Sequence, residues 1–203
     1  MWGARNAAKL ECMPPRRSDP RTRRTCQRLG SALVELIREK PIEAITVQEV
    51  LDRARVGRST FYLHYRDKND LLFSQLAMFL DVMSTRLSQQ KERSSRLVAI
   101  EEMFEHIGGQ NRMYAALAEA GRLQDFYDLA QDAFARGIAR RLRELGCARH
   151  LSRTELAVRA TALAGSLLAL MRWWIERGAK ESPKTMDAMY HRMAWAGMEG
   201  KPD

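Results

Sequence analysis

The sequence predicts an all-α protein of about nine helices. Apolar residues recur three and four residues apart over most of the chain, and this spacing places them on one face of a helix. Only twelve glycines and six prolines interrupt the 203 residues, and no segment alternates convincingly as a strand does. With 45% hydrophobic and 29% charged residues, the composition is that of a folded globular protein with a buried core.

Residues 1–21 are expected to form a basic, flexible arm. Residues 1–28 carry eight basic side chains and two acidic ones, and therefore hold most of the formal net charge of +9. A basic end on a nearly balanced body suggests a polyanion as partner, while a solvated tail would have the same composition. Met13 is an alternative start to Met1, because the first twelve residues show no strong structural pattern.

Three helices are predicted within residues 22–66. The first carries an apolar stripe and ends at Pro41; the stripe is Leu29, Leu33, Leu36 and Ile37. The second begins at Thr46, which forms a capping box with Glu49. A break at residues 55–57 separates it from a third helix over about 58–65. Two short helices joined by a tight turn and backed by a longer one form a helix-turn-helix, which reads DNA.

Residues 67–203 are expected to form a second, larger helical domain. Its helices are predicted at about 68–90, 95–107, 111–120, 123–145, 152–177 and 183–197. Asp67, Ser152 and Ser182 are the expected N-caps, and Pro183 takes the first helical position after the last of them.

The segment from residue 160 to residue 174 is apolar nearly all round. A helix with such a surface needs two partners to cover it, and one of them can be a second subunit. Small residues let helices approach closely there: Ala160, Ala164, Gly165 and Ala169. We therefore predict a homodimer through residues 155–177 and 183–197; the alternative is a central helix of a monomer.

No motif indicates catalysis or metal binding. The four histidines lie far apart in the sequence, and no HExxH, GxSxG, P-loop or GxGxxG pattern occurs. We expect a protein that is not an enzyme and that needs no cofactor and no metal.

The cysteines and the apolar runs predict the compartment. Cys12, Cys26 and Cys147 are odd in number and lack CxxC spacing, so no disulfide framework is implied. The longest uncharged run of the C-terminal half has twelve residues, fewer than the roughly twenty of a membrane-spanning helix. No apolar segment of a secretory signal follows the basic N-terminal residues. The sequence therefore predicts a cytoplasmic protein without a membrane partner.

Residues 42–72 closely resemble the N-terminal domain of the tetracycline-repressor (TetR) family. The resemblance lies in the helix start at Thr46, the small Ala54 before the turn, the run RSTFY at 58–62, the His64-Tyr65 pair and the Asp67-Lys68 pair. It implies a double-stranded DNA operator as partner, bound by Thr46, Arg58, Ser59, Thr60, Tyr62, His64 and Lys68.

Each of these residues has a role that the resemblance implies. Arg58, Ser59 and Thr60 would open the recognition helix and reach base edges in the major groove. The side chains that would contact phosphates are Tyr62, His64 and Lys68. Thr46 is expected mainly to cap its helix and in addition to touch the DNA backbone. Phe61 and Tyr65 are expected to pack inward.

Two residues depart from the family pattern at the turn. Arg55 stands where such proteins usually have glycine, at a position that often needs a positive φ. Gly57 stands where serine often caps the recognition helix. The turn is therefore expected to differ in its detailed geometry.

The resemblance also implies a cavity for a small apolar ligand in the C-terminal domain. The candidate lining residues are Met83, Met103, Phe104, Ile107, Tyr114, Phe126, Phe134 and Trp174. Ordinary core packing would produce the same pattern of large apolar residues.

The predicted function is that of a sequence-specific DNA-binding transcription regulator, in the form of a homodimeric, ligand-responsive repressor. Two alternatives remain open. One is a DNA-binding or division-control protein without an inducer; the other is a helical carrier or enzyme that only resembles the family.

Overall fold

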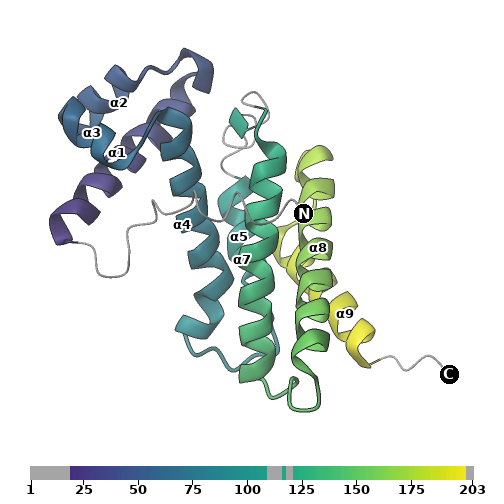
Figure 1. Cartoon of the computed structure of the whole chain (residues 1–203). Coiled ribbons are helices and arrows are strands. Elements are labelled where there is room, and N and C mark those ends of the chain that lie inside the picture. Colours follow the sequence, from purple (N-terminus) through teal and green to yellow (C-terminus); the bar gives the residue numbers. More distant parts are fainter. Residues whose placement is uncertain (1–18, 109–115, 118–120, 200–203) are drawn as a thin grey trace. The chain divides into compact units, whose positions relative to one another are not determined.

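The computed structural model of the chain describes residues 19–108, 116–117 and 121–199. Within these residues every regular element is a helix, and no strand occurs (Figure 1). The predicted all-α class is therefore confirmed. Of the helix predicted at 111–120, only residues 116 and 117 are described, and both are helical.

The helical elements follow one another in this order: α1 (Pro20–Glu39), the 3-10 turn η2 (Ile42–Ala44), α2 (Val47–Ala54), α3 (Arg58–His64), α4 (Lys68–Gln89), α5 (Ile100–Gly108), α7 (Leu123–Glu144), α8 (Arg153–Glu176) and α9 (Pro183–Glu199). Asp19 caps α1, because its carboxylate accepts a hydrogen bond from the Arg21 amide at 3.0 Å. Helix α1 therefore takes in residues 20 and 21, which the sequence assigns to the arm.

The chain divides into two compact units. Of the described residues, the first unit holds 19–78, 116–117 and 121–126, and the second holds 79–108 and 127–199. The N-terminal half of α4 belongs to the first unit and its C-terminal half to the second. The sequence predicts a domain boundary between residues 66 and 67, just before α4, whereas the two units divide within α4.

The first unit is built on a close approach of α1 to α4. Gly30 of α1 lies directly against the side chain of Gln75, so a Cβ at residue 30 would displace that amide. Arg122 lies over the ring of Phe73 at 4.2 Å from its centroid and ties the 121–126 segment to α4. Leu29 and Leu33 of the predicted apolar stripe are fully buried.

The second unit packs α5, α7, α8 and α9 with the end of α4. Gly137 of α7 lies against the backbone carbonyl of Ser84 in α4, which leaves no room for a Cβ. The guanidinium of Arg141 is buried and donates to the carbonyl oxygens of Glu92, Ser94 and Arg96 at 2.7–2.9 Å. This side chain therefore anchors the loop between α4 and α5.

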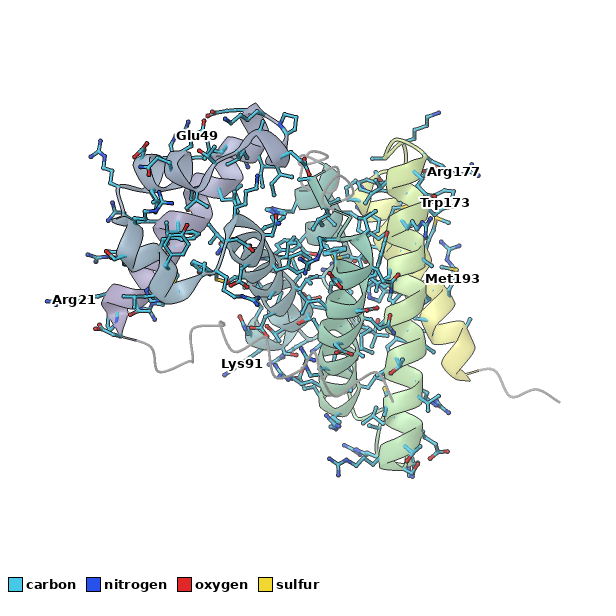
Figure 2. The ribbon with its side chains drawn as sticks, turned by 45° about the horizontal axis from the view of Figure 1, so that its top comes forward. Arg21, Glu49, Lys91, Trp173, Arg177 and Met193 are labelled. Carbon is cyan, nitrogen blue, oxygen red and sulfur yellow. The ribbon has the colours of Figure 1, made fainter. Side chains whose placement is uncertain are left out.

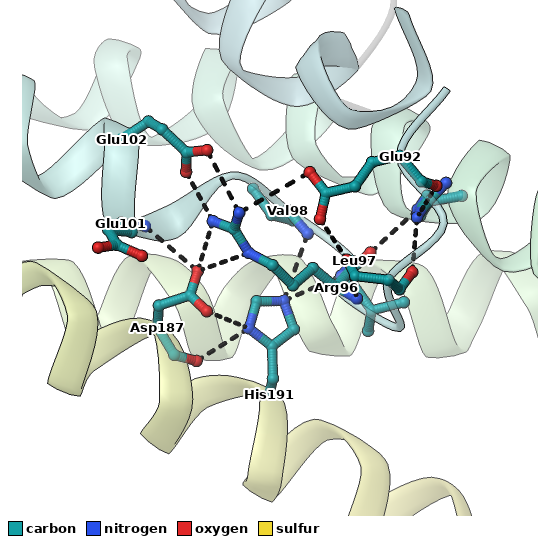
Figure 3. Close-up of polar contacts among 10 residues, drawn as sticks. Glu92, Arg96, Leu97, Val98, Glu101, Glu102, Asp187 and His191 are labelled. Carbon is teal, nitrogen blue, oxygen red and sulfur yellow. Dashed lines mark hydrogen bonds and ion pairs between the residues drawn. The ribbon is translucent and has the colours of Figure 1, made fainter. Parts of the chain in front are cut away.

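A polar cluster joins the same loop to α9, as Figure 3 shows. The guanidinium of Arg96 pairs with Glu102 at 2.6 Å and with Asp187 at 2.8 Å. His191 accepts the Leu97 amide proton on Nε2 at 2.9 Å, while its Nδ1 lies 2.8 Å from the Asp187 carbonyl oxygen. Because Nε2 accepts, Nδ1 is the ring nitrogen that donates to the Asp187 carbonyl oxygen.

This cluster corrects the predicted start of α5. The sequence predicts helix from about residue 95, but α5 begins at Ile100. The amides of Leu97 and Val98 both point at the imidazole of His191, at 2.9 and 3.5 Å. A side chain from a distant helix thus takes the hydrogen bonds that these amides would otherwise leave free before the helix start.

Candidate nucleic-acid interface

The N-terminus of α2 has the predicted capping box. The Thr46 hydroxyl accepts the Glu49 amide proton at 3.2 Å, and the Thr46 amide donates to Oε2 of Glu49 at 2.9 Å. Lys40 donates to the same carboxylate at 2.6 Å. The hydrogen bond from Lys40 and those from Thr46 lower the pKa of Glu49 to about 2, so it remains ionised. The cap fixes the start of α2 beside the predicted DNA surface.

Helix α3 is held by its aromatic residues. Phe61 is fully buried and Tyr65 nearly so, as the sequence predicts, and their ring centroids lie 5.7 Å apart. Tyr62 meets Phe61 edge to face at 5.3 Å but leaves 49% of its own surface exposed. The inward residues therefore fix the helix while the opposite face stays open to solvent.

That open face carries the predicted base-reading residues. Arg58 and Ser59 are exposed in the first turn, and Thr60 is half-buried beside them. The guanidinium of Arg58 lies 5.7 Å from the Tyr62 ring centroid and 3.5 Å from Oε1 of Gln48. These contacts are weak, so the guanidinium remains available to a partner. His64 is half-buried at the end of the helix, next to the ring of Tyr65.

Lys68 has a role that the sequence does not reveal. Its ammonium donates to the carbonyl oxygens of Ile42, Glu43 and Ile45, at 2.6, 3.1 and 2.7 Å. An ammonium has three donors, and all three are engaged here. Lys68 therefore fastens the segment that precedes α2, and a direct phosphate contact would have to replace one of these bonds.

The turn holds Arg55 in a backbone conformation that is unfavourable for a residue with a side chain. Arg55 adopts φ 51° and ψ 50°, in the left-handed region that disfavours a side chain. Gly57 stands at the N-cap of α3 and offers no side-chain hydrogen bond. Both departures noted in the sequence thus lie within this turn.

One exposed residue of α3 is missing from the predicted site. Leu63 leaves 80% of its surface in solvent, although it is large and apolar. An apolar side chain on a recognition helix can contact the methyl group of thymine. In the sequence, the signal is its position on the same short helix as the inward residues Phe61 and Tyr65, but between Tyr62 and His64.

Comparison with known families decides what this arrangement is. Residues 30–74 match the model of the bacterial regulatory proteins of the tetR family. Residues 97–194 match the model of a transcriptional regulator C-terminal region. The chain belongs to the TetR family. It is a DNA-binding transcription regulator, and members of this family bind operators and typically dimerise.

Solved structures with the same fold include several regulators. A TetR-family regulator from Syntrophomonas wolfei has 17% identity and a TM-score of 0.59, over 88% of this chain and 96% of that one. The dihydroxyacetone kinase operon activator DhaS has 14% identity and a TM-score of 0.65, over 86% and 96%. The fatty acid degradation regulator FadR from Bacillus halodurans has 16% identity and a TM-score of 0.58, over 92% and 100%. Comparison with curated protein sequences gives no significant match.

The predicted ligand residues of this TetR-family chain fall into three groups. In the second unit Ile107 is half-buried, and the buried residues are Met83, Met103, Phe104, Phe134 and Trp174. Phe104 and Trp174 contact each other directly, with ring centroids 4.7 Å apart. Phe126 belongs to the first unit, and Tyr114 lies outside the described residues.

The predicted dimer helices leave large apolar side chains exposed. Val158 and Trp173 on α8 and Met189 and Met193 on α9 all reach solvent. Figure 2 shows Trp173, Arg177 and Met193 along the edge of the second unit that α8 and α9 form. By length and composition α8 is also apolar enough to cross a membrane, a property that core helices of soluble proteins share.

Among the described residues, no three histidine, cysteine, aspartate or glutamate side chains lie close enough to hold one ion.

Proposed function

We propose that this TetR-family regulator is a homodimeric repressor that binds its operator through α2 and α3 and releases it when a small apolar ligand binds. The observation that carries the proposal is the open face of α3. A short helix is held from behind by buried Phe61 and Tyr65, while Arg58, Ser59 and Tyr62 face solvent. This is the arrangement that a major-groove reader needs.

The side chains of that face divide into readers and anchors. Arg58 pairs with a guanine, for which its two parallel donors are suited, while Ser59 and Thr60 donate to bases or phosphates. Tyr62 and His64 donate to phosphate oxygens, and Thr46 brings the N-terminus of α2 against the backbone. Leu63 adds an apolar contact with a thymine methyl. Lys68 contributes its charge while it holds the segment before α2.

The dimer is proposed through α8 and α9. The exposed apolar residues Val158, Trp173, Met189 and Met193 support it, because covering apolar surface with a second subunit removes it from water. The Tyr190 hydroxyl donates to the Leu163 carbonyl at 3.0 Å, and this bond ties the two helices into one surface. Burial raises the pKa of this hydroxyl, which therefore keeps its proton.

An apolar ligand is proposed for the second unit, near Phe104 and Trp174. Large apolar side chains gather there, and Gly108 keeps the space beside the Trp174 ring, since a Cβ would lie 3.2 Å from it. Two of the similar solved structures, FadR and a Clostridium perfringens protein, are named as regulators of fatty acid degradation or metabolism. An acyl chain is thus the first ligand class to test.

A regulator of this kind acts in the cytoplasm and needs no catalysis, cofactor or metal. The test begins with selection of a duplex from a randomised pool by the full-length protein, followed by a mobility-shift titration. Sequence-preferring, salt-sensitive binding by a dimer is expected, and fatty acids of graded length should release the duplex. Failure to select any sequence would refute the DNA-reading role. Selection without release by any apolar compound would favour a regulator without an inducer.

A further inference from the structure

A cluster of arginines lies beside the turn of the helix-turn-helix. It lines an open groove of about 500 Å³ between α1 and the end of α2, and we call it the arginine groove. Its lining includes Arg24, Gln27, Arg28 and Ser31 from α1 and Arg55 from the turn. None of these residues is among the DNA contacts that the family resemblance implies.

The four arginines that line the groove outnumber its one acidic lining residue, Glu35. Arg53, which also lines it, is bound by Glu39 at 2.8 Å and by Glu35 at 3.5 Å. Arg28 spends one donor on the Arg55 carbonyl oxygen, at 2.8 Å, and keeps its full charge. Within the described part of the chain, the side chains of Arg24 and Arg55 have no polar partner. Three positive charges therefore face the groove without an acidic neighbour bound to them.

The arrangement of these arginines along α1 fits a strand of nucleic acid better than a small anion. Arg21, Arg24 and Arg28 follow one face of α1 at a spacing of three and four residues, and all are exposed. Seven residues of helix span about 10 Å, and one DNA strand carries a phosphate about every 3.4 Å of its axis. Figure 2 shows Arg21 at the outer end of α1. The groove itself is open rather than enclosed.

The backbone at Arg55 adds a further reason. A left-handed conformation is unfavourable for a residue with a side chain, and glycine would avoid this cost. Arg55 stands only three residues before Arg58, the first residue of the recognition helix. Arg55 therefore belongs to the turn that leads directly into the helix proposed to read DNA.

We propose that the arginine groove binds the phosphate backbone of the operator, beside the major groove that α3 reads. The inference rests on the proposed DNA-reading function and extends it to a second contact surface. Phosphate contacts carry affinity and salt dependence but little sequence information. The groove therefore strengthens binding without choosing the sequence.

The test compares two double variants of the full-length protein on a duplex selected by the wild type. Arg24→Ala with Arg55→Ala removes the two unpartnered groove charges. Arg140→Ala with Arg143→Ala removes two exposed charges from α7 and serves as the matched control. The logarithm of the binding constant is measured against the logarithm of the salt concentration.

The groove variant should have a salt slope shallower by about 2, and at 0.15 M salt its binding should be about fivefold weaker for each arginine removed. Its sequence preference should not change. Arg24→Lys with Arg55→Lys should restore most of the slope. Arg55→Gly alone should bind about fivefold more weakly while remaining at least as stable as the wild type, which separates the contact from folding.

Two results would overturn the proposal while leaving the DNA-reading role intact. One is a wild-type slope and affinity in the groove variant; the other is an equal loss in the α7 control, which would mean that net charge alone matters. If the wild type selects no duplex, the DNA-reading role fails and the groove fails with it.

Discussion

Different kinds of contact stabilise the inside of each of the two units. In the first unit, the start of α2 is decided by a capping box between residues three apart, and α3 is held by aromatic side chains four apart. In the second, His191 and Asp187 of α9 bind the loop before α5 across more than 90 residues of chain. The start of α2 and the packing of α3 thus depend on residues close in the sequence, whereas the loop before α5 depends on long-range pairs.

The largest effect is expected from the anchor of α3. Phe61→Ala removes a fully buried ring and should destabilise the protein by about 4 kcal/mol. Hydrogen exchange should accelerate first in peptides of α1 to α3. Leu63→Ala, on the exposed side of the same helix, should change stability by less than about 0.5 kcal/mol. Equal losses in both variants would contradict the assignment of an inward and an outward face to α3.

Arg141 gives the matching test in the second unit. Arg141→Met leaves the carbonyl oxygens of Glu92, Ser94 and Arg96 without their donor and should cost about 3 kcal/mol. Exchange should increase in residues 90–100 and in α9. Arg140→Met is the control, since this neighbour is exposed and should be nearly neutral. Unchanged exchange in the loop would show that Arg141 does not anchor it.

A smaller effect, of opposite sign, is expected at the turn. Arg55→Gly relieves a left-handed residue and should stabilise the protein by about 1 kcal/mol, measured by chemical denaturation. Arg53→Gly, which stands inside α2, should destabilise instead by about 1 kcal/mol or more. A loss of stability in Arg55→Gly would mean that this side chain supports the turn.

The smallest effect concerns acid stability of the polar cluster. Burial acts to raise the pKa of Asp187, but hydrogen bonds from His191 and Arg96 outweigh it and hold the pKa below its usual 3.8. The unfolded chain therefore binds this proton more readily, so the stabilisation is present above about pH 4 and lost as the pH falls through the folded value. Asp187→Asn should flatten this part of the stability profile between about pH 5 and 2.5. An unchanged profile would show that Asp187 does not contribute to acid stability.

The sequence predicted well the features that depend on contacts between residues close in the chain. The cap at Thr46, the inward aromatic pair and the turn at Arg55 all depend on contacts within a few positions. The start of α5 was predicted five residues early, because the amides of Leu97 and Val98, just before the helix, bind a histidine more than 90 residues away. The carbonyl contacts of Lys68 reach back more than 20 residues, and they too escape a local pattern.

The arginine groove shows the same limit within the DNA-binding unit. The spacing of Arg21, Arg24 and Arg28 on one helix face is visible in the sequence. Their approach to Arg55 is not, because it depends on how α1 packs on the end of α2. The ligand and dimer residues remain predictions for a different reason: they depend on partners outside the chain.

The most direct measurement of the central claim compares Arg58→Ala with wild type on the selected duplex and on every single-base variant of it. Arg58→Ala should weaken binding about tenfold or more and lose discrimination at one guanine position, with the other positions unchanged. A uniform loss at all positions would make Arg58 a phosphate contact. Undiminished affinity and discrimination would contradict the claim that the open face of α3 reads the operator.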